Sequence, residues 1–161
     1  MSIKDVISNL EKLTMLQKSL VNISMQKTEI IKSEDVEPLN QLIKNESKHI
    51  QVIKKIEADL IAISKEVNGM EEDSPTITDL IHLAEGDEQE RLLALKQELE
   101  ETIGALTKRN RLNQQLLEQS LQFIQVSMDL LNPTIDSYNY EKPNQSSEYE
   151  ELNRSIFNSK A

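Results

Sequence analysis

The longest hydrophobic pattern in this chain covers residues 87–131, where apolar side chains recur at steps of three and four. This spacing places them on one face of an α-helix. Asp87 can cap the first free amides of such a helix and Pro133 cannot continue it, so we expect one helix over about 87–131. With a rise of about 1.5 Å per residue, this helix is roughly 65 Å long and needs a partner along its length. Its apolar stripe consists of Leu92, Leu95, Leu99, Ile103, Leu106, Leu117, Leu121, Ile124, Met128 and Leu131.

Two earlier stretches have the same spacing and predict long helices over about 2–31 and 35–67. Residues 33–38 break the pattern, because Pro38 fits a helix easily only in its first turn. Two long helices that are joined by a few residues must run antiparallel. The first half of the chain is therefore predicted to be a helical hairpin.

Turn signals separate the hairpin from the long third helix. Asn68 and Gly69 form a typical helix end, and Thr76 with Asp79 three residues later predicts a capping box for a short helix over about 76–84. The predicted fold class is all-α: a long antiparallel helical hairpin plus a long third helix, packed as an up-and-down three-helix bundle with coiled-coil-like contacts.

Two asparagines, Asn110 and Asn113, occupy positions of the stripe where the spacing asks for leucine. An asparagine in a helical seam commonly fixes register and partner number at some cost in stability, so we assign both residues to seam register. Leucine at both positions is expected to raise the melting temperature while permitting wrong oligomers, unless the amides make hydrogen bonds that the fold cannot spare.

Beyond Pro133 the helical pattern is lost, and Asn, Ser, Pro, Glu and Tyr dominate. Such a segment is too polar to fold alone. We therefore expect an elongated helical bundle over 1–132 and a flexible tail over 133–161. Within the tail, residues 148–157 have an amphipathic spacing that suits a short helix against a surface.

The composition fits extended amphipathic helices better than a thick globular core, since 29% of the residues are charged and 3% are aromatic. Cysteine is absent, which excludes disulfides, zinc thiolate sites and thiol catalysis. No stretch resembles a signal peptide or a membrane span, so we expect a cytoplasmic protein without direct membrane insertion. Residues 69–101 hold eleven acidic and two basic residues, almost all of the net charge of −10, which argues against nucleic acid as a partner.

Candidate chemistry is limited to two carboxylate–histidine pairs at helical spacing, Glu46 with His49 and Asp79 with His82. A di-iron site in a four-helix bundle uses such pairs, but it also needs inward glutamates from two other long helices, and the first and third predicted long helices offer none. No Gly-rich phosphate loop and no Ser-His-Asp or Cys-His set is present in the sequence. We therefore expect no enzyme activity, no metal and no cofactor, with a metal-binding bundle kept as an alternative.

The segment 110–124, Asn-Arg-Leu-Asn-Gln-Gln-Leu-Leu-Glu-Gln-Ser-Leu-Gln-Phe-Ile, follows a helical hairpin and precedes a proline and a tyrosine-bearing tail. In this arrangement the chain resembles FlgN-type flagellar export chaperones, most specifically from residue 110 to Tyr138. The resemblance implies a cytoplasmic, ATP-independent chaperone that binds C-terminal helical segments of the hook–filament junction proteins FlgK and FlgL and prevents their premature assembly or degradation.

The resemblance also implies delivery of the clients to the membrane export gate of the flagellar type III apparatus, with Tyr138 as the docking residue. The family's tail tends to read tyrosine, a small residue and then glycine. In this chain Asn139 and Tyr140 follow Tyr138.

A hairpin with one more long helix has too few elements to cover every apolar surface, so we expect a groove for a client helix in the second half of the long helix. The apolar stripe there is too broad for one seam. The candidate client-binding residues are Leu116, Leu117, Leu121, Phe123, Ile124, Met128 and Leu131. As an alternative, these residues form ordinary bundle or dimer core in a structural coiled-coil protein without a client; as a chaperone, the chain is expected to be a monomer or a weak dimer.

Overall fold

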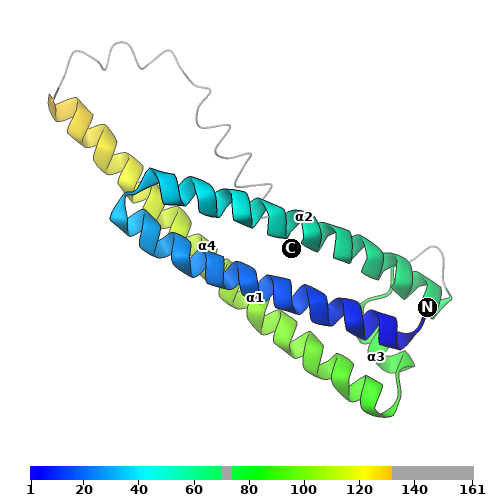
Figure 1. The fold of residues 1–161 in the computed structure, drawn as a ribbon. Helices are drawn as coiled ribbons and strands as arrows, with labels where there is room; N and C mark the ends of the chain where they lie inside the picture. Colours follow the sequence, from blue (N-terminus) through cyan, green and yellow to red (C-terminus); the bar gives the residue numbers. More distant parts are fainter. Residues whose placement is uncertain (70–73, 132–161) are drawn as a thin grey trace.

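The computed structural model describes residues 1–69 and 74–131, and these residues form four α-helices (Figure 1). The helices are α1 (Ile3–Ser33), α2 (Val36–Asn68), α3 (Ile77–Leu83) and α4 (Gly86–Leu131). The predicted all-α class, with a long antiparallel hairpin and a long third helix, is confirmed. The predicted helix stop at Pro133, the tail 133–161 with its short helix at 148–157, and Tyr138 all lie outside the described residues.

The ends of the hairpin helices follow from local backbone chemistry. Glu34 follows α1 in a left-handed conformation with φ of 58°, and Asp35 then precedes α2 in an extended conformation. Pro38 lies in the first turn of α2, where its missing amide costs no hydrogen bond. Gly69 ends α2 with φ of 69°, a conformation that glycine adopts without a steric penalty.

The short helix α3 begins with the predicted capping box. The Thr76 hydroxyl oxygen accepts a hydrogen bond from the Asp79 amide at 3.2 Å, and the Asp79 carboxylate accepts one from the Thr76 amide at 2.7 Å. The hydroxyl and the backbone amide of Thr76 together hold the pKa of the Asp79 carboxyl below its usual range. The capping box therefore starts the helix that leads the chain from α2 into α4.

The core of the bundle lies along α1, which packs against both α2 and α4. Within the described residues, α2 and α4 make almost no contact with each other. Fully buried members of the core include Val6 and Leu20 of α1, Ile53 of α2, and Leu92 and Leu106 of α4. The central helix is therefore α1, although α4 is the longest.

The helix α4 runs parallel to α1 and antiparallel to α2 (Figure 1). Side-chain pairs between α1 and α4 ascend together along both helices: Glu11 with Arg91, Lys18 with Glu98, Ser24 with Asn110, and Thr28 with Asn113. From the last of these pairs, Ser33 at the end of α1 is level with about residue 118 of α4. The last 13 or so residues of α4, about 20 Å of helix, therefore extend past the turn between α1 and α2, as the yellow end of α4 shows (Figure 1).

Candidate binding surface on the distal end of the longest helix

Residues 117–131 of α4, most of which extend past the hairpin, are called the distal arm below. Its large apolar side chains are exposed, with exposed fractions between 36% at Leu117 and 84% at Leu131. The exposed apolar residues of the arm are Leu117, Leu121, Phe123, Ile124, Val126, Met128, Leu130 and Leu131. Exposed apolar surfaces of this extent are typical of interaction sites.

Helical geometry separates these side chains into two stripes, because successive residues are rotated by about 100°. The first stripe contains Leu117, Leu121, Ile124, Met128 and Leu131. It has the same direction, within about 40°, as Leu106 and Asn113, which are buried in the bundle. The first stripe is therefore the continuation of the packing face of α4 past the end of α1.

The second stripe contains Leu116, Phe123, Val126 and Leu130 and lies about 140° around the helix from the first. Its base borders a small hollow of about 190 Å³, which is lined by Leu116, Gln119, Ser120 and Phe123 of α4 and by Ile31, Lys32 and Glu34 at the end of α1. Leu116 is half-buried there, whereas Phe123 is exposed. The candidate client-binding residues thus form two separate surfaces of one helix.

Val126 and Leu130 are not among the candidates predicted from the sequence, although both are exposed in the arm. They lie on a different face of the helix from the apolar stripe of residues 87–131, so the spacing of that one stripe does not include them. Together with Phe123 they repeat at positions i, i+3 and i+7, which is itself a helical stripe. This repeat is the signal that would have identified the second surface.

The two asparagines assigned to the seam lie buried between α1 and α4. Asn110 Oδ1 accepts a hydrogen bond from the Ser24 hydroxyl at 2.9 Å. Asn113 Nδ2 donates to the Ser24 carbonyl at 2.9 Å, and Asn113 Oδ1 accepts from the Thr28 hydroxyl at 2.5 Å. Their role in register stays a prediction. Because the amides are paired with α1, replacement of only the asparagines would leave polar groups of α1 without these partners, which favours a loss of stability.

Glu46 and His49, which have a spacing that suits metal ligands, make other contacts. The buried Glu46 carboxylate forms an ion pair with the Lys27 ammonium group of α1 at 2.6 Å. His49 Nε2 lies 2.9 Å from the Ser19 hydroxyl, and His49 Nδ1 lies 2.9 Å from the Asn45 carbonyl oxygen. In the described part of the chain, no group of three or more His, Asp or Glu side chains could hold a metal ion. These two residues instead connect α2 to α1.

The fold and the distal arm define a class of protein: an elongated helical bundle with exposed apolar side chains at the end of its longest helix. None of the helices in the described ranges is long and apolar enough to cross a membrane. Residues 1–148 match the FlgN protein family, and the chain belongs to this family. It is 34% identical over 161 residues, the whole of both chains, to YvyG of Bacillus subtilis (strain 168), a protein described as uncharacterized. No solved structure matches the chain.

Family membership confirms the resemblance inferred from residues 110–138. FlgN proteins are flagellar export chaperones of FlgK and FlgL, so the general role of this chain is flagellar protein export and it is not an enzyme.

Proposed function

We propose that this protein holds FlgK and FlgL in the cytoplasm on its distal arm, prevents their premature assembly or degradation, and delivers them to the export gate. The exposed apolar surface of the arm is the observation that carries this proposal. Membership in the FlgN family implies FlgK and FlgL as the clients. The arm has an exposed apolar surface that suits the binding of their helical segments. In this proposal residues 1–132 are the holding bundle and residues 133–161 are the delivery tail.

The first stripe offers a specific way to bind a client helix. Inside the bundle, the same face of α4 packs along α1, and past Ser33 that partner ends. A client helix laid on the first stripe would continue the position of α1 with the same steps of three and four. Burial of one exposed leucine or isoleucine contributes about 1.5–3 kcal/mol, so a few such contacts suffice for specific binding.

The variants Leu121→Ala and Phe123→Ala test the two stripes separately. We expect each variant to weaken binding to purified FlgK or FlgL by about 1–3 kcal/mol if its stripe contacts the client, with helix content nearly unchanged. Titration calorimetry measures the affinity and circular dichroism measures the helix content. Leu93→Ala, at an exposed leucine near the start of α4, is the matched control and should bind as the original chain does.

The opposite results of this experiment are distinct. Loss of the fold together with loss of binding would place these side chains in a core. Full binding by both arm variants would remove the distal arm from the interface.

Oligomerisation through the first stripe is a second candidate function, because a second copy would also cover these side chains. It predicts a tight dimer that Leu121→Ala weakens in sedimentation experiments without any client. The proposed chaperone is instead a monomer or a weak dimer that co-purifies with FlgK or FlgL from the same cell. A tight dimer that captures neither junction protein would decide against the chaperone.

Delivery to the export gate is assigned to Tyr138. A tyrosine combines a large apolar ring with a hydroxyl that tolerates water, so it can be exposed in the free protein and fill a pocket on a docking partner. We expect Tyr138→Ala to leave client affinity within about 0.5 kcal/mol of the original while strongly reducing binding of the loaded chaperone to the purified gate. Tyr140→Ala is the control: if it alone fails to dock, the role belongs to Tyr140, and if both variants dock, neither tyrosine is the delivery signal.

A further inference from the structure

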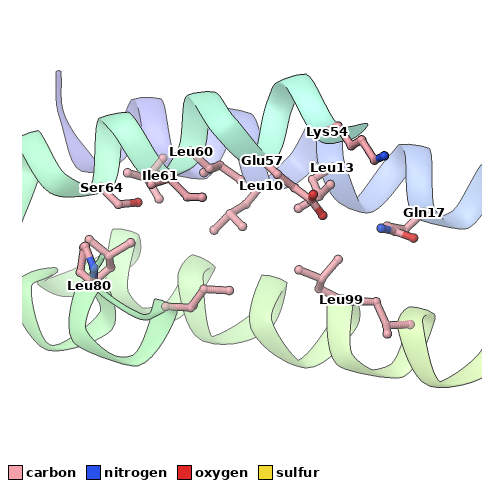
Figure 2. A pocket seen from close by; sticks show the side chains of 14 residues that line it. Leu10, Leu13, Gln17, Lys54, Glu57, Leu60, Ile61, Ser64, Leu80 and Leu99 are labelled. Carbon is pink, nitrogen blue, oxygen red and sulfur yellow. The ribbon is translucent and has the colours of Figure 1, made fainter. Parts of the chain in front are cut away.

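A second apolar surface lies away from the distal arm, in the groove between α2 and α4. Since α1 packs against both helices while they make almost no contact with each other, side chains of α1 form the floor of this groove. Its volume is about 560 Å³, comparable to that of ligand pockets. Leu10 and Leu13 of α1, Leu60 of α2, Leu80 of α3 and Leu99 of α4 line it (Figure 2).

Gln17 of α1 is a polar residue in this apolar floor (Figure 2). The residue is 2% exposed, and its Oε1 atom has no hydrogen-bond partner among the described residues. A buried acceptor without a partner costs about 1–3 kcal/mol, so a turn of the Gln17 side chain that brings Oε1 to a hydrogen-bond donor of an occupant would be stabilising here.

Glu57 belongs to the α2 wall of the same groove (Figure 2). Partial burial raises the pKa of its carboxyl, although the nearby Lys54 acts in the opposite direction. The groove therefore suits a segment with apolar side chains, an amide donor for the floor and a cation for this wall.

Residues 149–157 of the same chain have this combination of side chains. At about 100° per residue, Tyr149, Leu152, Ile156 and Phe157 share one face of a helix. Asn153 falls inside this apolar face, and Arg154 falls near its edge. An amide on an apolar face is costly to bury unless it meets a hydrogen-bonding partner.

We propose that residues 149–157 dock as a short amphipathic helix in the groove between α2 and α4 of the same chain. Asn153 Nδ2 then donates a hydrogen bond to Gln17 Oε1. This bond gives the Gln17 oxygen a donor and the Asn153 amide an acceptor. Arg154 lies beside the Glu57 carboxylate. This docking goes beyond the proposed chaperone function, because it concerns the free protein and a surface other than the distal arm.

The chain is long enough for this docking. The parallel pairs between α1 and α4 place Gln17 level with about residue 100 of α4, roughly 46 Å of helix before Leu131. With Asn153 at Gln17, Tyr149 lies about 6 Å nearer the arm, so the tether must span roughly 40 Å. The 18 steps from Leu131 to Tyr149 reach about 60 Å when extended, which leaves about 20 Å for the path around the bundle.

The absence of cysteine makes docking directly measurable, since two introduced cysteines carry the only spin labels. We choose Lys55→Cys on the exposed side of α2 and Ser155→Cys on the polar face of the segment. Pulsed dipolar spectroscopy of the full chain, diluted with unlabelled protein, should show a narrow short-distance component that Ile156→Asp abolishes. A broad distribution that Ile156→Asp leaves unchanged would overturn the proposal.

The amide pair is tested by a double replacement. Gln17→Leu leaves the Asn153 amide without its acceptor, and we expect the ratio of docked to free segment to fall about fivefold or more. Asn153→Leu should have the same effect, while the two changes together replace the pair by apolar contact and restore docking. Gln51→Leu, at an exposed glutamine of α2, is the control. Equal docking in all variants, or no recovery in the double variant, would overturn the proposed pairing.

Other occupants of the groove give different results. If a second copy supplies the segment, the narrow component disappears on dilution with unlabelled protein. If a client helix occupies the groove, the segment is free in the isolated chain. Either result contradicts docking within one chain. Because the measurement needs no client, it fails or succeeds independently of client binding by the distal arm.

Discussion

The hydrogen bonds of Asn113 give a quantitative prediction for the seam between α1 and α4. The residue is 3% exposed and its amide makes two hydrogen bonds to α1, one to the Ser24 carbonyl and one from the Thr28 hydroxyl. Each such bond contributes about 0.5–1.5 kcal/mol, so their loss in Asn113→Ala costs about 1–3 kcal/mol. The higher helix propensity of alanine offsets up to about 0.7 kcal/mol of this cost. We expect the free energy of unfolding to fall by about 1–2 kcal/mol.

A double-mutant cycle with Thr28→Val isolates the hydrogen bond between the two side chains. Valine keeps the shape of threonine but removes the hydroxyl, so the bond to Asn113 is lost in each single variant and only once in the double variant. We expect the loss of unfolding free energy in the double variant to be smaller, by about 1 kcal/mol, than the sum of the losses in the two single variants. Urea unfolding followed by circular dichroism gives these values at a fixed protein concentration.

Thr107→Val is the matched control, because the exposed Thr107 hydroxyl donates to the Ile103 carbonyl of its own helix. Its cost should stay within about 0.5 kcal/mol. Single costs of Asn113→Ala and Thr28→Val that add within about 0.3–0.5 kcal/mol would refute the pairing. A gain of stability in Asn113→Ala would support the expectation from sequence that seam asparagines weaken the bundle.

Two further predictions concern charged groups. Lys27→Met leaves the Glu46 carboxylate buried without its ion-pair partner and should lower the free energy of unfolding by about 3 kcal/mol. Adding Glu46→Met should recover most of this loss. No loss of stability in Lys27→Met would show that the pair is solvated. The pKa of the Asp79 carboxyl is lower in the folded state than in the unfolded chain, so its contribution to stability is complete above the unfolded-state pKa and is lost as the pH falls through the folded-state pKa. Thr76→Ala should raise the pKa of Asp79 in an NMR titration, and an unchanged pKa would contradict the role of the capping box.

Hydrophobic spacing predicted the helices and the face of α4 that packs, but not how much of that face is covered. The stripe has the same spacing from Leu92 to Leu106, where it is buried, and from Leu117 to Leu131, where it is exposed. The difference lies in the partner, because α1 ends at Ser33. How much of an apolar face is buried depends on the length and alignment of the partner helix. The spacing of apolar residues in one helix gives no information on either.

The groove between α2 and α4 could not be predicted for a related reason. Spacing shows that three long helices each have an apolar face, and a symmetric bundle in which each helix touches both others satisfies it equally well. In the structure α1 alone packs against both other long helices, which leaves the groove open. The sequence did contain one pointer, because Gln17 lies in the stripe of α1, four residues after Leu13 and three before Leu20.

Some polar side chains in the packing faces have a hydrogen-bond partner on the facing helix and others do not, and this difference affects stability measurably. Asn113 meets Ser24 and Thr28 of α1, whereas the Gln17 Oε1 atom meets no donor in the described part of the chain. If the tail segment supplies that donor, Gln17→Leu should raise the free energy of unfolding by about 1–3 kcal/mol in an Ile156→Asp background, where the segment is released and the acceptor is unpaired. In the original background the gain should be smaller, because the same change also removes a hydrogen bond to the docked segment. Urea unfolding of the four chains measures both gains, and an equal gain in the two backgrounds would mean that the tail does not reach Gln17.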